Sequence, residues 1–243
     1  MARNRSRSSA WTTRHTAAKL LGVSEKTVRE WIRHDGMPAH RVSEEVRFSR
    51  AELLEWATAH GHPVAGDLFA EAPGADTPGL ADALAAGGVH HGLAGADREA
   101  ALRALVEQMR LPPDVDRAFL YHVLLARESM QSTAIGDGIA IPHVRNPIVL
   151  HVEQPRITLG FLETPVDFGA LDGHPVHTLF AVVSPTVRAH LHLLSRIAFA
   201  LRDPAFRDVV RRRGSEVEVV AEARRVDSEL SRHTSGGAEP RGA

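Results

Sequence analysis

The sequence predicts an α/β domain with a central mixed sheet flanked by helices, preceded by a small, mainly helical winged helix-turn-helix domain. Three observations predict this arrangement. The first 62 residues carry short helical patterns and an excess of basic residues. The segment that follows is rich in proline and glycine and contains acidic but no basic residues up to position 88. From about residue 80, apolar strand patterns alternate with amphipathic helical ones, which is typical of a sheet covered by helices.

Composition divides the chain into five parts. Residues 1–62 hold two lysines and nine arginines against seven acidic residues, a net charge of +4, although the whole chain carries −1. Such asymmetry indicates two modules with different partners. We therefore expect a disordered arm at 1–10, a basic helix-turn-helix domain at 11–62, a linker at 63–79, a larger α/β domain at 80–226 and a disordered tail at 227–243.

The overall composition excludes several classes of protein. Hydrophobic residues make up 43% of the chain and charged residues 24%, which suits a soluble protein with a substantial core. The chain has no cysteine, so disulfides, thiolate nucleophiles and cysteine metal sites are excluded. It also lacks a secretory signal and any apolar run of about 20 residues. We expect a cytoplasmic protein with no membrane partner.

The first domain contains three short helical patterns. The first covers about 16–21, and the second follows Ser24, a favourable N-cap, and continues to about His34. Ser49 and Glu52 have the spacing of a capping box and predict the start of the third. A short alternating run before Ser49 predicts a β-wing.

The predicted second helix carries a cationic face. Lys26, Arg29 and Arg33 lie at i, i+3 and i+7 and therefore share one side of the helix. A helix of this kind can enter the major groove of DNA. The candidate DNA-binding residues are these three with the flanking Thr27 and, on the wing, Arg41 and Arg47. A protein-interaction module whose cationic face is merely solvated remains the alternative.

The first domain resembles a known family. The run Ala-Ala-Lys-Leu-Leu-Gly-Val-Ser at 17–24 and the pair Trp31-Ile32 match the excisionase-type, MerR-like winged helix-turn-helix pattern, as do Gly36, Pro38 and Phe48. The resemblance implies that the domain binds duplex DNA through its second helix. One such domain has a small footprint, so specific binding would need a homodimer or another partner.

The second domain shows alternating helix and strand signals. Apolar patterns predict helices at about 97–109, 114–128 and 187–202, a strand region at 134–143, and strands at 157–162 and 178–183. Asp203-Pro204 has the sequence of a helix start, and Ser215 with Glu218 repeats the capping-box pattern.

His143 carries the strongest chemical signal in this domain. It follows a Gly-x-Gly turn, a short apolar strand and Pro142, so it should lie at a strand end, where α/β sheets open onto clefts. A neutral imidazole is a competent nucleophile near pH 7. Arg127 is a candidate for binding phosphoryl oxygens. His190, in the first turn of its helix, lies where backbone N–H groups favour anions.

The same stretches resemble the type 2 enzyme IIA domain of the bacterial phosphotransferase system, in its fructose, mannitol and nitrogen-regulatory branch. The motif Gly-Ile-Ala-Ile-Pro-His at 138–143 and the stretches 168–177 and 190–194 carry the resemblance. It implies that His143 is the phosphorylated histidine, Arg127 the active-site arginine and His190 the second histidine. It also implies a donor such as HPr or its nitrogen-branch relative, with a transient phosphohistidine and no cofactor or metal.

Two positions depart from the family pattern. Ala134 stands where glycine is frequent, and Val144 stands where glycine or alanine is common. Val144 is expected to add bulk beside the nucleophile and to alter the donor or the rate.

Together these signals favour a transcriptional regulator linked to the phosphotransferase system, a phosphoryl carrier rather than a metabolic enzyme. Two alternatives stay open: a sugar-transport IIA protein that passes phosphate to a IIB partner, and an interaction module that is not phosphorylated. The histidine pairs 90/91, 174/177 and 190/192 invite a metal interpretation. Adjacent or i+2 histidines do not share a helix face, however, and no set of carboxylates completes such a site.

Overall fold

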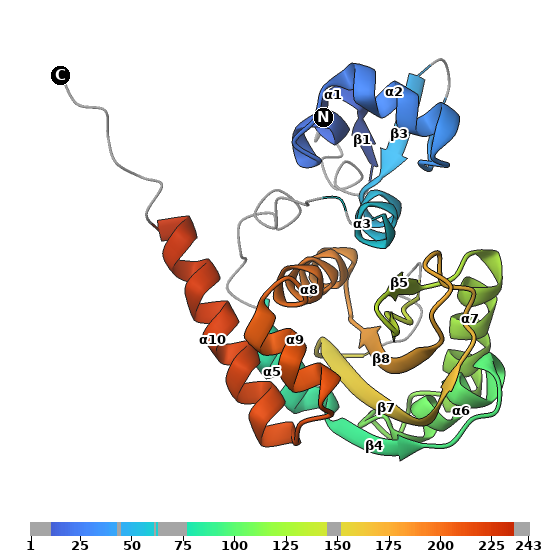
Figure 1. Cartoon of the computed structure of the whole chain (residues 1–243), viewed down its shortest axis with the longest axis vertical. Coiled ribbons are helices and arrows are strands. Elements are labelled where there is room, and N and C mark those ends of the chain that lie inside the picture. The colour runs from blue at the N-terminus through green and yellow to red at the C-terminus, as the bar shows by residue number, and fades with distance from the viewer. Residues whose placement is uncertain (1–10, 43–44, 61, 63–76, 145–151, 236–243) are drawn as a thin grey trace, which may run out of the picture.

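The structure is a computed structural model that describes residues 11–42, 45–60, 62, 77–144 and 152–235. It consists of a small N-terminal domain, termed the head, and a larger α/β domain, termed the body (Figure 1). The expected arm at 1–10, most of the expected linker and residues 236–243 lie outside the described residues.

The head is a winged helix-turn-helix. Its elements are β1 (Trp11–Thr13), α1 (Arg14–Leu20), α2 (Glu25–His34), β2 (His40–Val42), β3 (Glu45–Ser49) and α3 (Arg50–Ala59). The strands form an antiparallel sheet in the order β1-β3-β2, so the wing is confirmed. Strand β1 was not predicted, because it is three residues long and directly follows a polar segment. Ser24 Oγ accepts from Thr27 N and Ser49 Oγ from Glu52 N, which confirms both N-caps.

The body is built around a five-stranded mixed sheet. Its elements are α5 (Leu80–Gly87), β4 (Val89–Leu93), α6 (Arg98–Gln108), α7 (Arg117–Met130), β5 (Ala134–Gly136), β6 (Ile139–Ala140), β7 (Arg156–Val166), β8 (Val176–Val183), α8 (Val187–Ala200), α9 (Pro204–Arg211) and α10 (Glu216–Ser235). The strand order is β4-β7-β8-β6-β5. The pairs β4–β7 and β6–β8 are parallel, whereas β7–β8 and β5–β6 are antiparallel.

Helices cover both faces of this sheet, and the alternation of side chains separates two hydrophobic clusters. Ile139 and Ile141 belong to the cluster with α5, α8, α9 and α10. Ala140 and Val144 belong to the cluster with α6 and α7. This is the period of two expected of a strand buried on both faces. The predicted fold class, a helix-flanked mixed sheet with a helical head, is confirmed.

The structure corrects the expected elements at three places. Helix α5 and strand β4 were not predicted, because Leu80–Gly87 is short and rich in alanine and Val89–Leu93 is interrupted by histidines and a glycine. The tail expected to be disordered from Asp227 is wrong as far as Ser235, since α10 continues to that residue.

The extension of α10 has a packing reason. Val226 and Leu230 are buried and continue the apolar stripe of the helix. The carboxylate of Asp227 accepts from the backbone N–H of Ala81 at 3.0 Å and pairs with Arg196 at 3.2 Å. The C-terminal helix is thereby fixed to α5 and α8. Among the described residues, no helix is long and apolar enough to cross a bilayer.

Candidate functional site

His143 is held at the end of a strand by main-chain bonds on both sides. Ile141 N donates to Thr133 O at 3.0 Å, and Val182 N donates to Pro142 O at 3.0 Å. His143 itself forms a parallel bridge with Val182 of β8. The alternation along this segment directs His143 to the face that also holds Ile139 and Ile141, which is the face covered by α8.

The same alternation locates Val144. Its side chain is fully buried in the cluster with α6 and α7, on the opposite face from His143. The bulk of Val144 is therefore directed away from the nucleophile. Its effect on the donor or the rate stays a prediction.

A hydrogen bond defines the chemistry of the two ring nitrogens of His143. Its Nδ1 lies 2.7 Å from the carbonyl oxygen of Ile141, which can only accept, so Nδ1 carries the hydrogen in the neutral ring. The lone pair of the neutral imidazole is then on Nε2. The fold thus presents His143 as a nucleophile through one defined nitrogen.

His190 lies beside this ring. The ring centroids of His143 and His190 are 5.2 Å apart, with their planes tilted by 46°. His190 is in the first turn of α8, whose N-cap Thr186 accepts from Ala189 N at 3.1 Å. His192, two positions further along, is also buried, and burial foremost, followed by the charge of Arg196, lowers its pKa to about 4. Of these two histidines, His190 is the one whose ring lies beside that of His143.

Arg127 and its neighbour Glu128 organise the other wall of the site. Arg127, in the last turn of α7, is 4% exposed and donates from Nη1 to Gln131 O at 2.7 Å, where it satisfies a carbonyl at the helix end. The buried Glu128 carboxylate accepts from Thr133 N at 3.0 and 3.1 Å and from Thr133 Oγ1 at 2.5 Å. These bonds fix the segment whose carbonyl at Thr133 positions Ile141.

The three predicted body residues are brought together. His143 and Arg127 line one small cavity of about 30 Å³, and His190 contacts the ring of His143. The other lining residues are Leu54, Thr58, Gln131, Ser132, Thr133, Ala134, Ile135, Ile141 and Leu194. Sequence reasoning did not anticipate Leu54 and Thr58, which come from the head, because the contact joins segments far apart in the chain.

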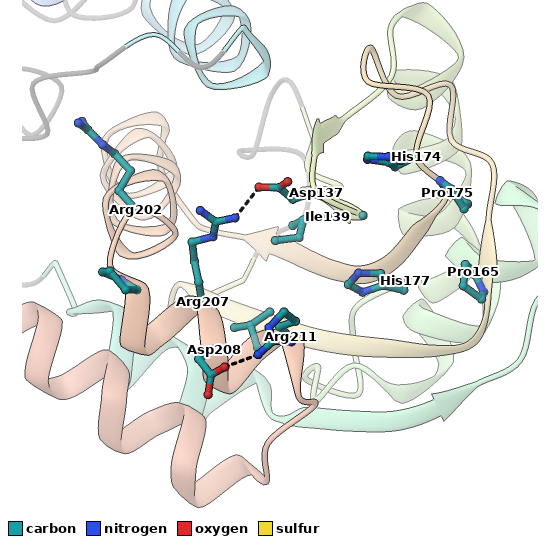
Figure 2. Close-up of a pocket in the computed structure, with 13 residues that line it drawn as sticks. Asp137, Ile139, Pro165, His174, Pro175, His177, Arg202, Arg207, Asp208 and Arg211 are labelled. Atoms are coloured by element: carbon teal, nitrogen blue, oxygen red, sulfur yellow. Dashed lines mark hydrogen bonds and ion pairs between the residues drawn. The ribbon is translucent and has the colours of Figure 1, made fainter.

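A larger cavity of about 650 Å³ lies between the β5–β6 turn and α9 (Figure 2). Two of the arginines that line it are paired with carboxylates: Arg207 donates to Asp137 at 2.7 Å and Arg211 to Asp208 at 2.6 Å. The pKa of His177, which lines this cavity, is lowered first by burial and second by the charge of Arg213. None of His143, Arg127 and His190 lines this cavity. Although it is larger, it is therefore not the candidate phosphoryl site. In the described parts of the chain, no group of three or more residues could hold a metal ion.

The connection between β5 and β6, beside this cavity, is the turn that the Gly-x-Gly sequence predicts. Gly136, Asp137 and Gly138 all have positive φ, at 94°, 52° and 71°, in the connection between the antiparallel β5 and β6. Asp172 accepts from Asp137 N at 2.8 Å and supports this backbone. The two glycines therefore allow the positive φ angles that this hairpin requires.

The head offers a second candidate site on its cationic side. Lys26, Arg29 and Arg33 are exposed on α2, and the nearest partner of Lys26 is Glu30 at 3.9 Å. Thr27 bonds to the N-cap Ser24 through its backbone and its hydroxyl. Of the wing residues, Arg47 on β3 is half-buried, whereas Arg41 is described only by its backbone in β2.

Between α2 and the wing lies a cationic hollow of about 310 Å³. It is lined by Arg14, Arg29, Ile32, Arg33, Ala39, His40 and Val46. Arg14 was missed by sequence reasoning, because it starts α1 and only the fold brings it to α2. Three arginines around one hollow suit an anionic backbone such as that of DNA.

Comparison with known proteins recognises both domains of the chain. Residues 84–223, more than half of the chain, match the family model described as phosphoenolpyruvate-dependent sugar phosphotransferase system, EIIA 2. The chain belongs to this family. Residues 15–61 match the model of a helix-turn-helix domain, so both modules are recognised.

Relatives of this EIIA 2 chain include a nitrogen regulatory protein and a fructose-specific component of the phosphotransferase system. The nitrogen regulatory protein of Escherichia coli strain K12 is 43% identical over 101 residues, 40% of this chain and 57% of the relative. The fructose-specific EIIABC component of Bacillus subtilis strain 168 is 36% identical over 105 residues, 42% of this chain and 15% of the relative. The crystal structure of nitrogen regulatory protein IIA-Ntr from Neisseria meningitidis has 26% identity and a TM-score of 0.49 over 56% of this chain and 92% of its own.

Proposed function

We propose that this chain is a DNA-binding regulator whose EIIA 2 domain accepts a phosphoryl group on Nε2 of His143. One observation carries the proposal: Nδ1 of His143 is 2.7 Å from Ile141 O, so the nucleophilic lone pair is on Nε2. Arg127 on the same cavity and His190 beside the ring supply the cation and the second imidazole that a phosphoryl group needs.

The transfer step can be written without a metal or cofactor. The Nε2 lone pair attacks the phosphorus of a donor phosphohistidine on a carrier of the HPr type or its nitrogen-branch relative. The Nε2–P bond forms as the donor N–P bond breaks, and the electrons of that bond remain on the donor imidazole. No proton is transferred, because Nδ1 keeps its hydrogen and Ile141 O stabilises the cationic ring that results.

The head supports the regulatory half of the proposal. The exposed arginines of α2 and the cationic hollow beside the wing fit the phosphates and base edges of duplex DNA. A IIA protein that only passes phosphate to a IIB partner has no need of such a domain. We therefore place transport, with a IIB partner, second to a role in transcription.

A phosphorylation assay tests the proposal. The full-length protein is incubated with labelled phosphoenolpyruvate, enzyme I and an HPr-type carrier, and acid-labile label on the chain is measured. We expect label only when all components are present. The matched control omits the carrier. Absence of label with both the HPr-type carrier and its nitrogen-branch relative would contradict the phosphocarrier function.

A further inference from the structure

The phosphoacceptor is covered in this structure. His143 is 2% exposed and His190 is 1% exposed. Transfer between two proteins requires the donor histidine to approach the acceptor nitrogen closely, in line with the N–P bond. A residue with this function should therefore lie open on the protein surface.

The cover is helix α3 of the head. This helix packs against α8 and β5 of the body, and Figure 1 shows it as the head helix nearest α8. Leu54 and Thr58, one turn apart, line the cavity that contains His143 and Arg127. Leu53 and Ala57 lie on a neighbouring face of α3 and are fully buried.

The contact between α3 and the body is buried and apolar, as in a protein core. Leu54 is 2% exposed and belongs to the same continuous hydrophobic cluster as Leu194 and Ile141 of the body. Since α3 also buries Leu53 and Trp56, it is buried on more than one side. A helix that is apolar on several sides is one that packs on several sides, rather than a surface helix. The sequence of α3 is therefore fitted to two neighbours, the head core and the phosphoacceptor face.

The space beneath α3 is too small for the modified residue. The cavity of about 30 Å³ has room for roughly one or two water molecules. A phosphoryl group adds phosphorus, three oxygens and about two negative charges. Arg127 can pair with part of that charge, but Leu54 and Leu194 close the cavity with side chains that cannot donate a hydrogen bond, so burying the rest would be costly.

We propose that α3 occupies the surface through which the phosphoryl donor reaches His143, so that docking of the head and phosphorylation of His143 exclude each other. This inference rests on the proposed function. The unphosphorylated chain keeps the head docked, the donor competes with α3 for one face, and the phosphohistidine holds the head away from that face. Helix α2, which carries the candidate DNA-binding residues, lies on the side of the head away from the body (Figure 1). Release of α3 therefore changes the position of the head relative to the body and leaves the DNA-binding face of α2 intact.

A reversible cross-link tests this exclusion. The chain has no cysteine, so Thr58→Cys with Gln131→Cys introduces the only two thiols, one on each side of the cavity. A short bismaleimide with a reducible linker joins them in the full-length protein. The joined protein should accept phosphate from the HPr-type carrier at least about tenfold more slowly than the same protein after reduction. The matched control is Lys26→Cys with Gln131→Cys, which places the first thiol on α2 and should not be joined within one chain.

Three results of the cross-linking experiment would overturn the inference. The joined and reduced proteins could accept phosphate at the same rate, or the thiols at 58 and 131 could join no faster than those of the control pair. If neither the reduced protein nor the wild type accepts phosphate, the proposed function fails and the inference fails with it.

A second variant guards against misfolding of the double-cysteine protein. Thr58→Glu puts a carboxylate into this cavity of about 30 Å³, should release α3, and should raise the phosphorylation rate at least about threefold. An unchanged rate contradicts the exclusion.

Discussion

Replacing His143 with alanine is expected to remove phosphorylation of the chain, with a loss of at least about 100-fold in the rate of label incorporation. The reason is that His143 supplies the attacking nitrogen, because its Nδ1 is held by Ile141 O and its lone pair is therefore on Nε2. The measurement is incorporation of acid-labile label from the carrier, with the folded state of each variant checked by its thermal transition.

Two further histidine variants control this experiment. His174→Ala removes an exposed histidine in the larger cavity and should leave the rate unchanged. His190→Ala should keep the acceptor but slow transfer by roughly 100-fold, the usual effect of removing one group that stabilises the transferred charge. Label persisting at the wild-type level in His143→Ala would show that another residue is the acceptor.

Reversing the charge of Arg29 and Arg33 together is expected to weaken DNA binding on the order of 100-fold, since each arginine that contacts a base or phosphate contributes about 1–3 kcal/mol. Both side chains are exposed on α2 and line the hollow beside the wing. The measurement is titration of labelled duplex DNA at several salt concentrations. The wild-type affinity should fall linearly with log salt, and the variant should show a shallower slope.

The control for this pair carries the same change in charge elsewhere. Arg224→Glu with Arg232→Glu alters two exposed arginines on α10 and should leave DNA affinity nearly unchanged. Equal loss of binding in both double variants would indicate that net charge, rather than the face of α2, governs the interaction. Wild-type protein that binds no duplex at low salt would favour a protein-interaction role for the head.

The fold offers a route by which the two proposed activities would communicate. The charge of a phosphohistidine is screened over about 8 Å at physiological ionic strength, so it cannot act on DNA through the linker. Coupling must therefore pass through a contact, either at a dimer interface or between head and body. Packing of α3 on α8 and β5 supplies the second of these contacts. The regulatory signal would then be whether α3 is docked.

Local signals in the sequence predicted much of the architecture. The N-caps Ser24 and Ser49, the start of α8 near Val187 and the Asp203-Pro204 start of α9 depend on neighbouring residues and could be recognised directly. The apolar runs at 157–162 and 178–183 also identified β7 and β8. Elements stabilised by distant partners escaped prediction: β1 exists because it pairs with β3, and α10 continues to Ser235 because its buried face packs on α5.

The candidate site shows the same division. His143, Arg127 and His190 were found because short motifs surround each of them, and the structure brings them together. The bond from Nδ1 to Ile141 O, which selects the nucleophilic nitrogen, depends on the course of the backbone between Ile141 and His143. The burial of His143 beneath α3 depends on two domains meeting. Neither leaves a periodic or motif signal in one sequence.

The most direct test of the central claim is to identify the phosphorylated atom. Protein labelled with ¹⁵N in its histidines is examined by long-range ¹H–¹⁵N spectra before and after incubation with phosphoenolpyruvate, enzyme I and an HPr-type carrier. We predict that one histidine, absent from the spectrum of His143→Ala, acquires phosphate on Nε2 while its Nδ1 retains the hydrogen bonded to Ile141 O. Phosphate on Nδ1 of His143, or on a histidine that persists in His143→Ala, would contradict the account.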